Sequence, residues 1–167
     1  MNHVEKLIKP LFLICALVST QAIALPTDKD QPVNIEADSV DINEATETAI
    51  YRGNVMLTQG SIKITANKVV VNKFQSENPY IIATGNLVHF SQLPDPKSPR
   101  IKGQALKTEY EMNSGKMQLT GKAVLTKGKN TFKNDRIIYD REKAVVKAGA
   151  SAKGKERVKI TIGPKKN

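Results

Sequence analysis

The feature of this sequence that most restricts its fold is a two-residue alternation of apolar and polar side chains. Apolar residues occupy every second position in three segments far apart in the chain, at residues 33–37, 62–65 and 158–162. Successive side chains of a strand point to opposite faces, so this pattern is typical of strands with one buried face. Beyond residue 24, no segment longer than ten residues has a convincing 3.6-residue period, and we expect helix to be minor.

Turn signals divide the alternating segments into short strands. Glycine-containing turns are predicted at residues 59–61, 113–116, 127–130 and 153–155, leaving strands of five to eight residues. At roughly eight to twelve residues per strand and turn, the chain forms about 12–16 antiparallel strands, which require two packed or rolled sheets. Prolines make residues 91–99 a stiff connection between two long proline-free tracts.

The two tracts resemble each other at an offset of 68 residues. Gly53 corresponds to Gly121 and Gly60 to Gly128 without a gap. A shorter unit lies within this repeat, because Gly53, Gly85 and Gly121 each follow an apolar-rich strand, and residues 148–150 form a weaker fourth copy. The repeats predict stacked hairpins that share one continuous core, with a bend or bulge at each glycine that curls the sheet.

A stack of hairpins ends in two strands whose outer backbone groups are unpaired. The alternating segments at residues 33–35 and 158–162 lie near the two ends of the chain and are apolar enough to pair with a neighbouring chain. Such pairing joins opposite ends of two molecules. It therefore predicts head-to-tail self-association that extends into filaments.

The first 24 residues have the features of a cleaved secretory signal peptide. Lys6 and Lys9 precede a short apolar run at residues 11–18, and residues 22–24 (AIA) form a cleavage pattern. We therefore expect export to the periplasm, with an uncleaved membrane anchor as the alternative. Cleavage removes Cys15, the only cysteine. We expect residues 25–163 to form a single domain and residues 164–167 a basic C-terminal tail.

The net charge and the small number of potential catalytic residues restrict the possible functions. The chain has 26 Lys and Arg against 16 Asp and Glu, which favours acidic partners. Nucleic acid is not expected, because no aromatic cluster interleaves the lysines. His89 is the only histidine after residue 24, and no nucleotide-binding glycine motif occurs, so we expect no enzyme, metal or cofactor. The acidic pairs Glu36/Asp38 and Glu109/Glu111 leave an envelope hydrolase as an alternative.

Three segments carry a resemblance to a known family. Residues 31–38 (QPVNIEAD), 53–60 (GNVMLTQG) and 66–71 (ANKVVV) resemble the OstA-like family of periplasmic lipopolysaccharide-transport proteins, and the resemblance covers nearly all of the chain after residue 24. It is weakest at residues 91–99 and 153–167. The resemblance implies an open, twisted β-jelly-roll whose apolar groove holds the acyl chains of lipopolysaccharide. It also implies a bridge between inner-membrane LptC and outer-membrane LptD, formed by edge-strand pairing.

Strand alternation and the resemblance together give candidate residues for the groove. Each of them is also a candidate for simple core packing. The conduit account requires an apolar trough that stays open along its length and at both ends, and a monomeric carrier of another lipid is the alternative. The candidate ligand-binding residues are Val33, Ile35, Val55, Leu57, Ile62, Ile64, Val69, Val71, Phe90, Leu119, Leu125, Phe132, Ile137 and Tyr139.

Overall fold

A computed structural model describes residues 28–164 of the chain. The predicted signal peptide, residues 1–24, and residues 165–167 of the predicted tail lie outside the described residues. None of the described helices is long and apolar enough to cross a membrane. The described elements are the 3₁₀ turns η1 (Asp28–Asp30) and η2 (Gly149–Ala152) and the strands β1 (Val33–Glu36), β2 (Ser39–Asn43), β3 (Thr48–Gln59), β4 (Ile62–Asn72), β5 (Tyr80–Gln92), β6 (Ile101–Glu111), β7 (Lys116–Lys127), β8 (Asn130–Asp140), β9 (Val145–Ala148) and β10 (Lys159–Thr161).

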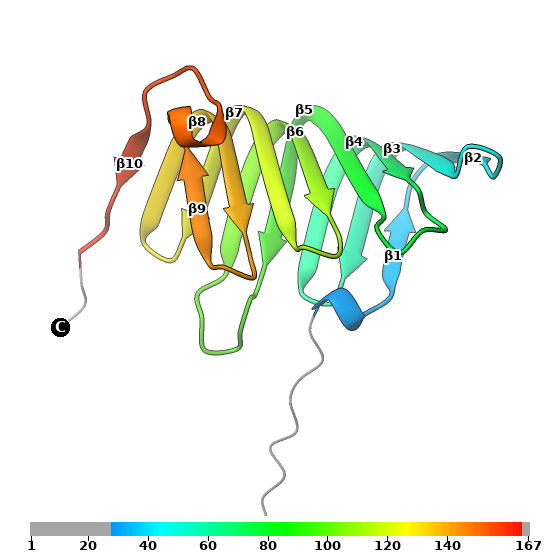
Figure 1. The fold of residues 1–167 in the computed structure, drawn as a ribbon, viewed down its shortest axis with the longest axis horizontal. Helices are drawn as coiled ribbons and strands as arrows, with labels where there is room; N and C mark the ends of the chain where they lie inside the picture. The colour runs from blue at the N-terminus through cyan, green and yellow to red at the C-terminus, as the bar shows by residue number, and fades with distance from the viewer. Residues whose placement is uncertain (1–27, 165–167) are drawn as a thin grey trace, which may run out of the picture.

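All ten described strands belong to one antiparallel sheet (Figure 1). Strands β3 to β8 follow one another as hairpins, so neighbours in sequence are neighbours in the sheet. At one end, β1 and β2 both pair with β3, and at the other end β9 and β10 both pair with β8. The predicted all-β, open antiparallel fold is confirmed.

The long strands bend at aligned positions, and the bends fold the sheet into two layers. The pairing register shifts once in each hairpin, for example between Arg52 and Val55 and between Thr120 and Ala123. Such bulges sharpen the local twist and bend the strand. The first layer contains β2, β9 and the strand segments 48–52, 68–72, 80–84, 107–111, 116–120 and 136–140; the second contains β1, β10 and the segments 55–59, 62–66, 88–92, 101–105, 123–127 and 130–134.

Glycine is favoured for two reasons at the bends of β3, β5 and β7, which contain Gly53, Gly85 and Gly121. Gly53 and Gly121 have φ of 78° and 77°, a conformation that residues with a Cβ avoid. The space beside the glycines is also filled by the adjacent strand: a Cβ on Gly121 would lie 3.1 Å from Leu106 Cδ1, and one on Gly85 would lie 2.6 Å from Asn67 Oδ1. The predicted curling of the sheet at glycines is therefore confirmed.

The internal repeat is visible in the strand boundaries, but the strand count differs from the prediction. β7 has the same length as β3 and begins 68 residues after it, and the same is true of β8 and β4. We expected 12–16 strands of five to eight residues, whereas the described residues form ten strands, six of them with 11 to 13 residues. The reason is that each bend lies within a continuous hydrogen-bonded strand instead of separating two strands.

The proline-rich connection is also shorter than predicted. Ser91 and Gln92 belong to β5, so the connection begins at Leu93. β5 and β6 pair from Tyr80–Glu111 to Gln92–Ile101, which makes this connection an ordinary hairpin loop. The two repeats are therefore halves of one continuous sheet.

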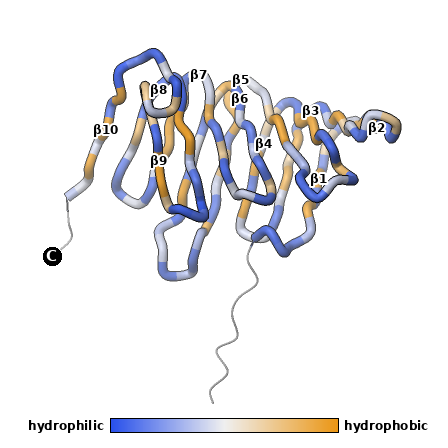
Figure 2. The backbone as a smooth tube through the Cα atoms, in the orientation of Figure 1, coloured by the Kyte–Doolittle hydropathy of each residue, from blue (hydrophilic) through white to orange (hydrophobic). Residues whose placement is uncertain are grey.

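The apolar side chains gather between the layers. Figure 2 shows hydrophobic residues concentrated on the strands, with hydrophilic residues at the turns. In the middle of the roll the layers interdigitate: Leu119 of the first layer reaches Gly103 of the second, where a Cβ would lie 3.1 Å from Leu119 Cδ1. Close packing of this kind leaves little free volume at the centre.

Candidate functional site

The fourteen candidate residues all belong to the single apolar core between the layers. Eleven of them are buried, and Val33, Ile35 and Phe132 are partly buried against that core. Direct cross-strand pairs link several of them, as in the row Ile35–Leu57–Ile64–Phe90 of the second layer. The structure therefore brings the predicted residues together, while their contact with lipid remains a prediction.

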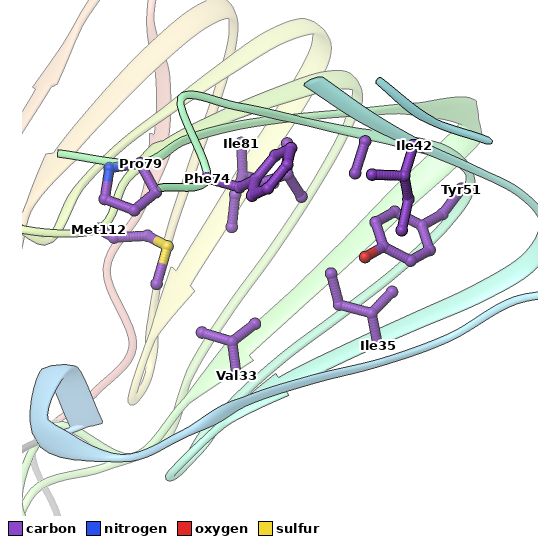
Figure 3. Close-up of a pocket in the computed structure, with 10 residues that line it drawn as sticks. Val33, Ile35, Ile42, Tyr51, Phe74, Pro79, Ile81 and Met112 are labelled. Atoms are coloured by element: carbon purple, nitrogen blue, oxygen red, sulfur yellow. The ribbon is translucent and has the colours of Figure 1, made fainter. Parts of the chain in front are cut away.

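Open space in this core occurs at the end formed by β1 and β2. An apolar pocket of about 290 Å³ lies there between the layers (Figure 3). In the close-up, Val33 and Ile35 on β1 face Phe74, Met112 and Ile42 across the pocket. Its lining residues are Val33, Ile35, Ile42, Ala49, Tyr51, Val71, Phe74, Pro79, Ile81 and Met112.

The pocket opens because β1 and β2 diverge. β1 pairs with the second-layer part of β3, whereas β2 pairs with its first-layer part and projects away at the end of the roll (Figure 1). Ile42 pairs with Ala49 and Val40 with Tyr51, which places both side chains on the interior face of the sheet. Ile42 is nevertheless 59% exposed, because no further strand of the described chain covers it.

Only three of the pocket residues, Val33, Ile35 and Val71, were among the fourteen candidates. Ile42, Ala49, Tyr51 and Ile81 were missed although their strand alternation gives a usable signal. The other three missed residues, Phe74, Pro79 and Met112, lie in turns, where no strand period applies.

The expectation of a trough open along its whole length is not met in this structure. The centre is filled by side chains from both layers, and Phe90, expected near the groove, is 3% exposed and does not line the pocket. The physical reason is that leucine and aromatic side chains from facing layers are long enough to interdigitate.

The free strand ends of the first layer, such as Tyr110 on β6, meet those of the second layer, such as Gln59 on β3, along a line that we call the seam. Polar groups close this seam. The Tyr110 hydroxyl of the first layer donates to Gln59 Oε1 of the second at 3.3 Å. Gln59 Nε2 in turn donates to the backbone carbonyls of Lys29 and Gln31, which both precede β1. Burial raises the pKa of Tyr110 to about 12, although the nearby Arg141 charge acts in the opposite direction.

Glu109, a member of one of the two acidic pairs, does not have the environment of a general acid. Glu109 lies on the outer face of the sheet. Its carboxylate accepts hydrogen bonds from Tyr80 (2.7 Å) and Gln118, and it forms an ion pair with Lys107 (2.8 Å). Burial acts to raise its pKa, but these three partners outweigh burial, and the pKa is lowered. A general acid needs a raised pKa, so the environment of Glu109 does not favour the hydrolase alternative.

Fold and site together define a class of protein: a single antiparallel sheet folded over an apolar interior, with a pocket at the β1–β2 end and, among the described residues, no further strand beside either edge. Residues 34–145 match the family described as LptA/(LptD N-terminal domain) LPS transport protein. The chain belongs to this family.

Individual relatives agree with this assignment. The chain is 31% identical to the lipopolysaccharide export system protein LptH of Pseudomonas aeruginosa, over 92% of this chain and 91% of that protein. It is 34% identical to the lipopolysaccharide export system protein LptA of Haemophilus influenzae, over 93% and 91%. The crystal structure of LptH from Pseudomonas aeruginosa, described as the LptA-homologous periplasmic component of a lipopolysaccharide transport device, superposes with a TM-score of 0.76 at 28% identity and covers 83% of this chain and 100% of that one.

A more distant relative has a larger architecture. The LPS-assembly protein LptD of Yersinia pestis is 29% identical over 54% of this chain, and the matched part is 12% of LptD. The shared region therefore occurs both as a separate protein and as a segment of a longer one.

Proposed function

We propose that this protein binds lipopolysaccharide through its acyl chains and carries it across the periplasm. The observation that supports this most directly is the apolar pocket between the layers, which is continuous with the core and opens at the β1–β2 end. The names of the relatives, which are lipopolysaccharide export proteins, point to the same ligand.

The physical need for such a pocket follows from the ligand. Each buried methylene contributes about 0.8 kcal/mol, so a fourteen-carbon chain resists transfer into water by roughly 10 kcal/mol. Free diffusion of a glycolipid with several such chains is therefore excluded. A folded sheet with an apolar interior shields the chains while the saccharide stays in water.

The two ends of the roll support assembly into a bridge. Val40 and Ile42 on β2 and Ile160 on β10 are exposed, and each pairs with a residue of the interior face. A second roll stacked head to tail would cover these side chains and extend the interior. The protein thus bridges the inner and outer membranes, with LptC and LptD as partners for its two edges.

Periplasmic residence completes this proposal. It depends on removal of residues 1–24 as a signal peptide, for which Lys6, Lys9 and the cleavage pattern at residues 22–24 are the support. Mass spectrometry of the exported protein should give an N-terminus at Leu25.

Lipid binding is tested with two matched charge substitutions on β1. Ile35 lines the pocket, whereas its neighbour Asn34 points to the opposite face of the strand. In a competition assay with fluorescent lipopolysaccharide, Ile35→Asp should weaken binding at least tenfold because a carboxylate in an apolar site is costly, and Asn34→Asp should have little effect. Equal effects of the two substitutions, or equal competition by deacylated saccharide, would refute the proposal.

Bridging is tested by the size of the exported protein in solution. Sedimentation velocity should show species that lengthen with protein concentration. A size independent of concentration would instead favour a monomeric carrier.

A further inference from the structure

The N-terminal turn η1 occupies the seam between the free ends of the two layers. Asp28 provides most of its contacts. Its carboxylate accepts hydrogen bonds from the Ser61 backbone N–H (2.6 Å) and hydroxyl (2.9 Å) and from Gln92 Nε2 (2.7 Å), all in the second layer. It also lies 3.7 Å from the guanidinium of Arg141, which follows β8 in the first layer.

A single carboxylate therefore holds both layers. The side chains of Asp28 and Arg141 are only 12% and 13% exposed, so this contact is well shielded from solvent. Arg141 is itself held against the β6–β7 turn, where a Cβ on Gly115 would lie 2.9 Å from Arg141 Nε. The Tyr110–Gln59 hydrogen bond crosses the same seam. Outside this seam lies a cleft of about 640 Å³ lined by Asp28, Gln31, Ser61 and Arg141, among others.

The topology makes this seam the lateral route into the interior. When the acyl chains of a glycolipid lie between the layers, its saccharide lies outside the roll. The covalent link between chains and saccharide must therefore cross the boundary of the roll. At the bends the boundary is continuous backbone, and along the layers it is a hydrogen-bonded ladder. Within residues 28–164, the seam is the part of this boundary between the two ends that side-chain contacts hold closed, and such contacts can separate without breaking the sheet.

We propose that the Asp28 turn is a latch that closes the seam and is released when acyl chains enter from the side or move along the roll. This inference rests on the proposed lipopolysaccharide function. It assigns to Asp28 and Arg141 a gating role that is separate from acyl-chain binding, because neither residue lines the apolar pocket.

The latch is tested by locking it reversibly. Asp28→Cys and Arg141→Cys are combined in the exported chain, in which the expected cleavage after residue 24 leaves no native cysteine, because Cys15 is the only one in the sequence. A short bifunctional thiosulfonate reagent joins the two thiols, and a reductant releases them. Loading of purified fluorescent lipopolysaccharide should be at least tenfold slower in the locked form than after release, with unchanged circular dichroism.

A control pair separates locking from chemical modification. Lys63 and Ser91 are direct cross-strand partners on the outer face of the second layer, so joining Lys63→Cys to Ser91→Cys leaves the seam free. This cross-link should not change the loading rate. Asp28→Ala, which removes the latch without a cross-link, should load at least as fast as the unmodified chain.

The possible outcomes distinguish a failure of the latch proposal from a failure of the proposed lipopolysaccharide binding. If the locked and released forms load equally fast, the latch is refuted while lipopolysaccharide binding stands. If the unmodified chain itself does not load lipopolysaccharide, both the proposed function and the latch are refuted.

Discussion

Tyr110 shows how one side chain joins the two layers of the roll. It is 2% exposed, and its hydroxyl donates across the seam to Gln59, which is equally buried. A buried hydroxyl needs such a partner, since an unsatisfied polar group costs stability. The same burial opposes ionisation of the phenol.

Tyr110→Phe should therefore change both stability and its pH dependence. An unfolded tyrosine ionises near pH 10 and Tyr110 in the folded chain near 12, so its contribution is complete below pH 10 and is lost as pH rises toward 12. At pH 8 the substitution should cost about 1–3 kcal/mol, because Gln59 loses its partner.

Urea unfolding of both proteins at several pH values measures this difference. Between pH 9 and pH 12 the original chain should lose up to about 2–3 kcal/mol more than Tyr110→Phe. A parallel decline of both proteins would show that Tyr110 does not resist ionisation in the fold.

Gly121 and Lys122 provide a second test at the residue scale. Both have positive φ, 77° and 51°, but the space beside Gly121 is filled by Leu106, whereas Lys122 is exposed. Gly121→Ala should destabilise the chain by about 1–2 kcal/mol or more, from the strained backbone and the contact with Leu106. Lys122→Gly should be close to neutral, because relief of strain offsets the added freedom of the unfolded chain. Thermal unfolding that shows equal effects would contradict this account of the bend.

At the scale of elements, the sequence predicts which segments are strands better than where they end. The alternation at residues 33–37 and 62–65 and the repeat of Gly53 at Gly121 correctly indicate antiparallel hairpins. Bends are harder to predict, because a bulge interrupts the two-residue period exactly as a turn does, although the backbone ladder continues through it. For this reason the sequence pattern predicts two short strands where the structure has one long strand.

The pocket was partly predictable for the same physical reason. Val33, Ile35 and Val71 follow the alternation of their strands, and Ile42 and Tyr51 follow it too. Phe74, Pro79 and Met112 enter the pocket from turns, where only the three-dimensional path of the chain determines side-chain direction. The closure of the seam by Asp28 joins residues up to 113 positions apart in the sequence, which no local pattern reveals.

The edge strand β10 allows the head-to-tail assembly to be tested. Ile160 pairs with Phe132 on the interior face and is 54% exposed, whereas the adjacent Thr161 points to the outer face. Burial of one such side chain is worth about 1.5–3 kcal/mol. Ile160→Lys should therefore weaken self-association at least tenfold, and Thr161→Lys should do so much less.

Sedimentation velocity over a concentration series gives the readout for both variants. An association constant that is unchanged in Ile160→Lys, with the fold intact by circular dichroism, would remove β10 from the interface. A loss of equal size in Thr161→Lys would show that charge on the edge, and not the interior face, controls assembly.

For the whole molecule, one sheet performs two tasks. Its fold encloses an apolar interior, and within residues 28–164 no further strand lies beside β1–β2 or β9–β10, the edges at which we propose that a neighbouring molecule docks. The excess of positive charge, with 26 basic against 16 acidic residues, favours an anionic ligand at long range. Specific recognition of the lipid then depends on the interior.

The central claim is that acyl chains lie between the two layers of the sheet. Photo-crosslinking with a photoreactive amino acid at Val33, at Ile35 and at the outward-facing Lys63 tests it in cells that make lipopolysaccharide. The account predicts covalent capture of lipopolysaccharide from Val33 and Ile35 and none from Lys63. Capture from Lys63 without capture from either interior position would contradict it.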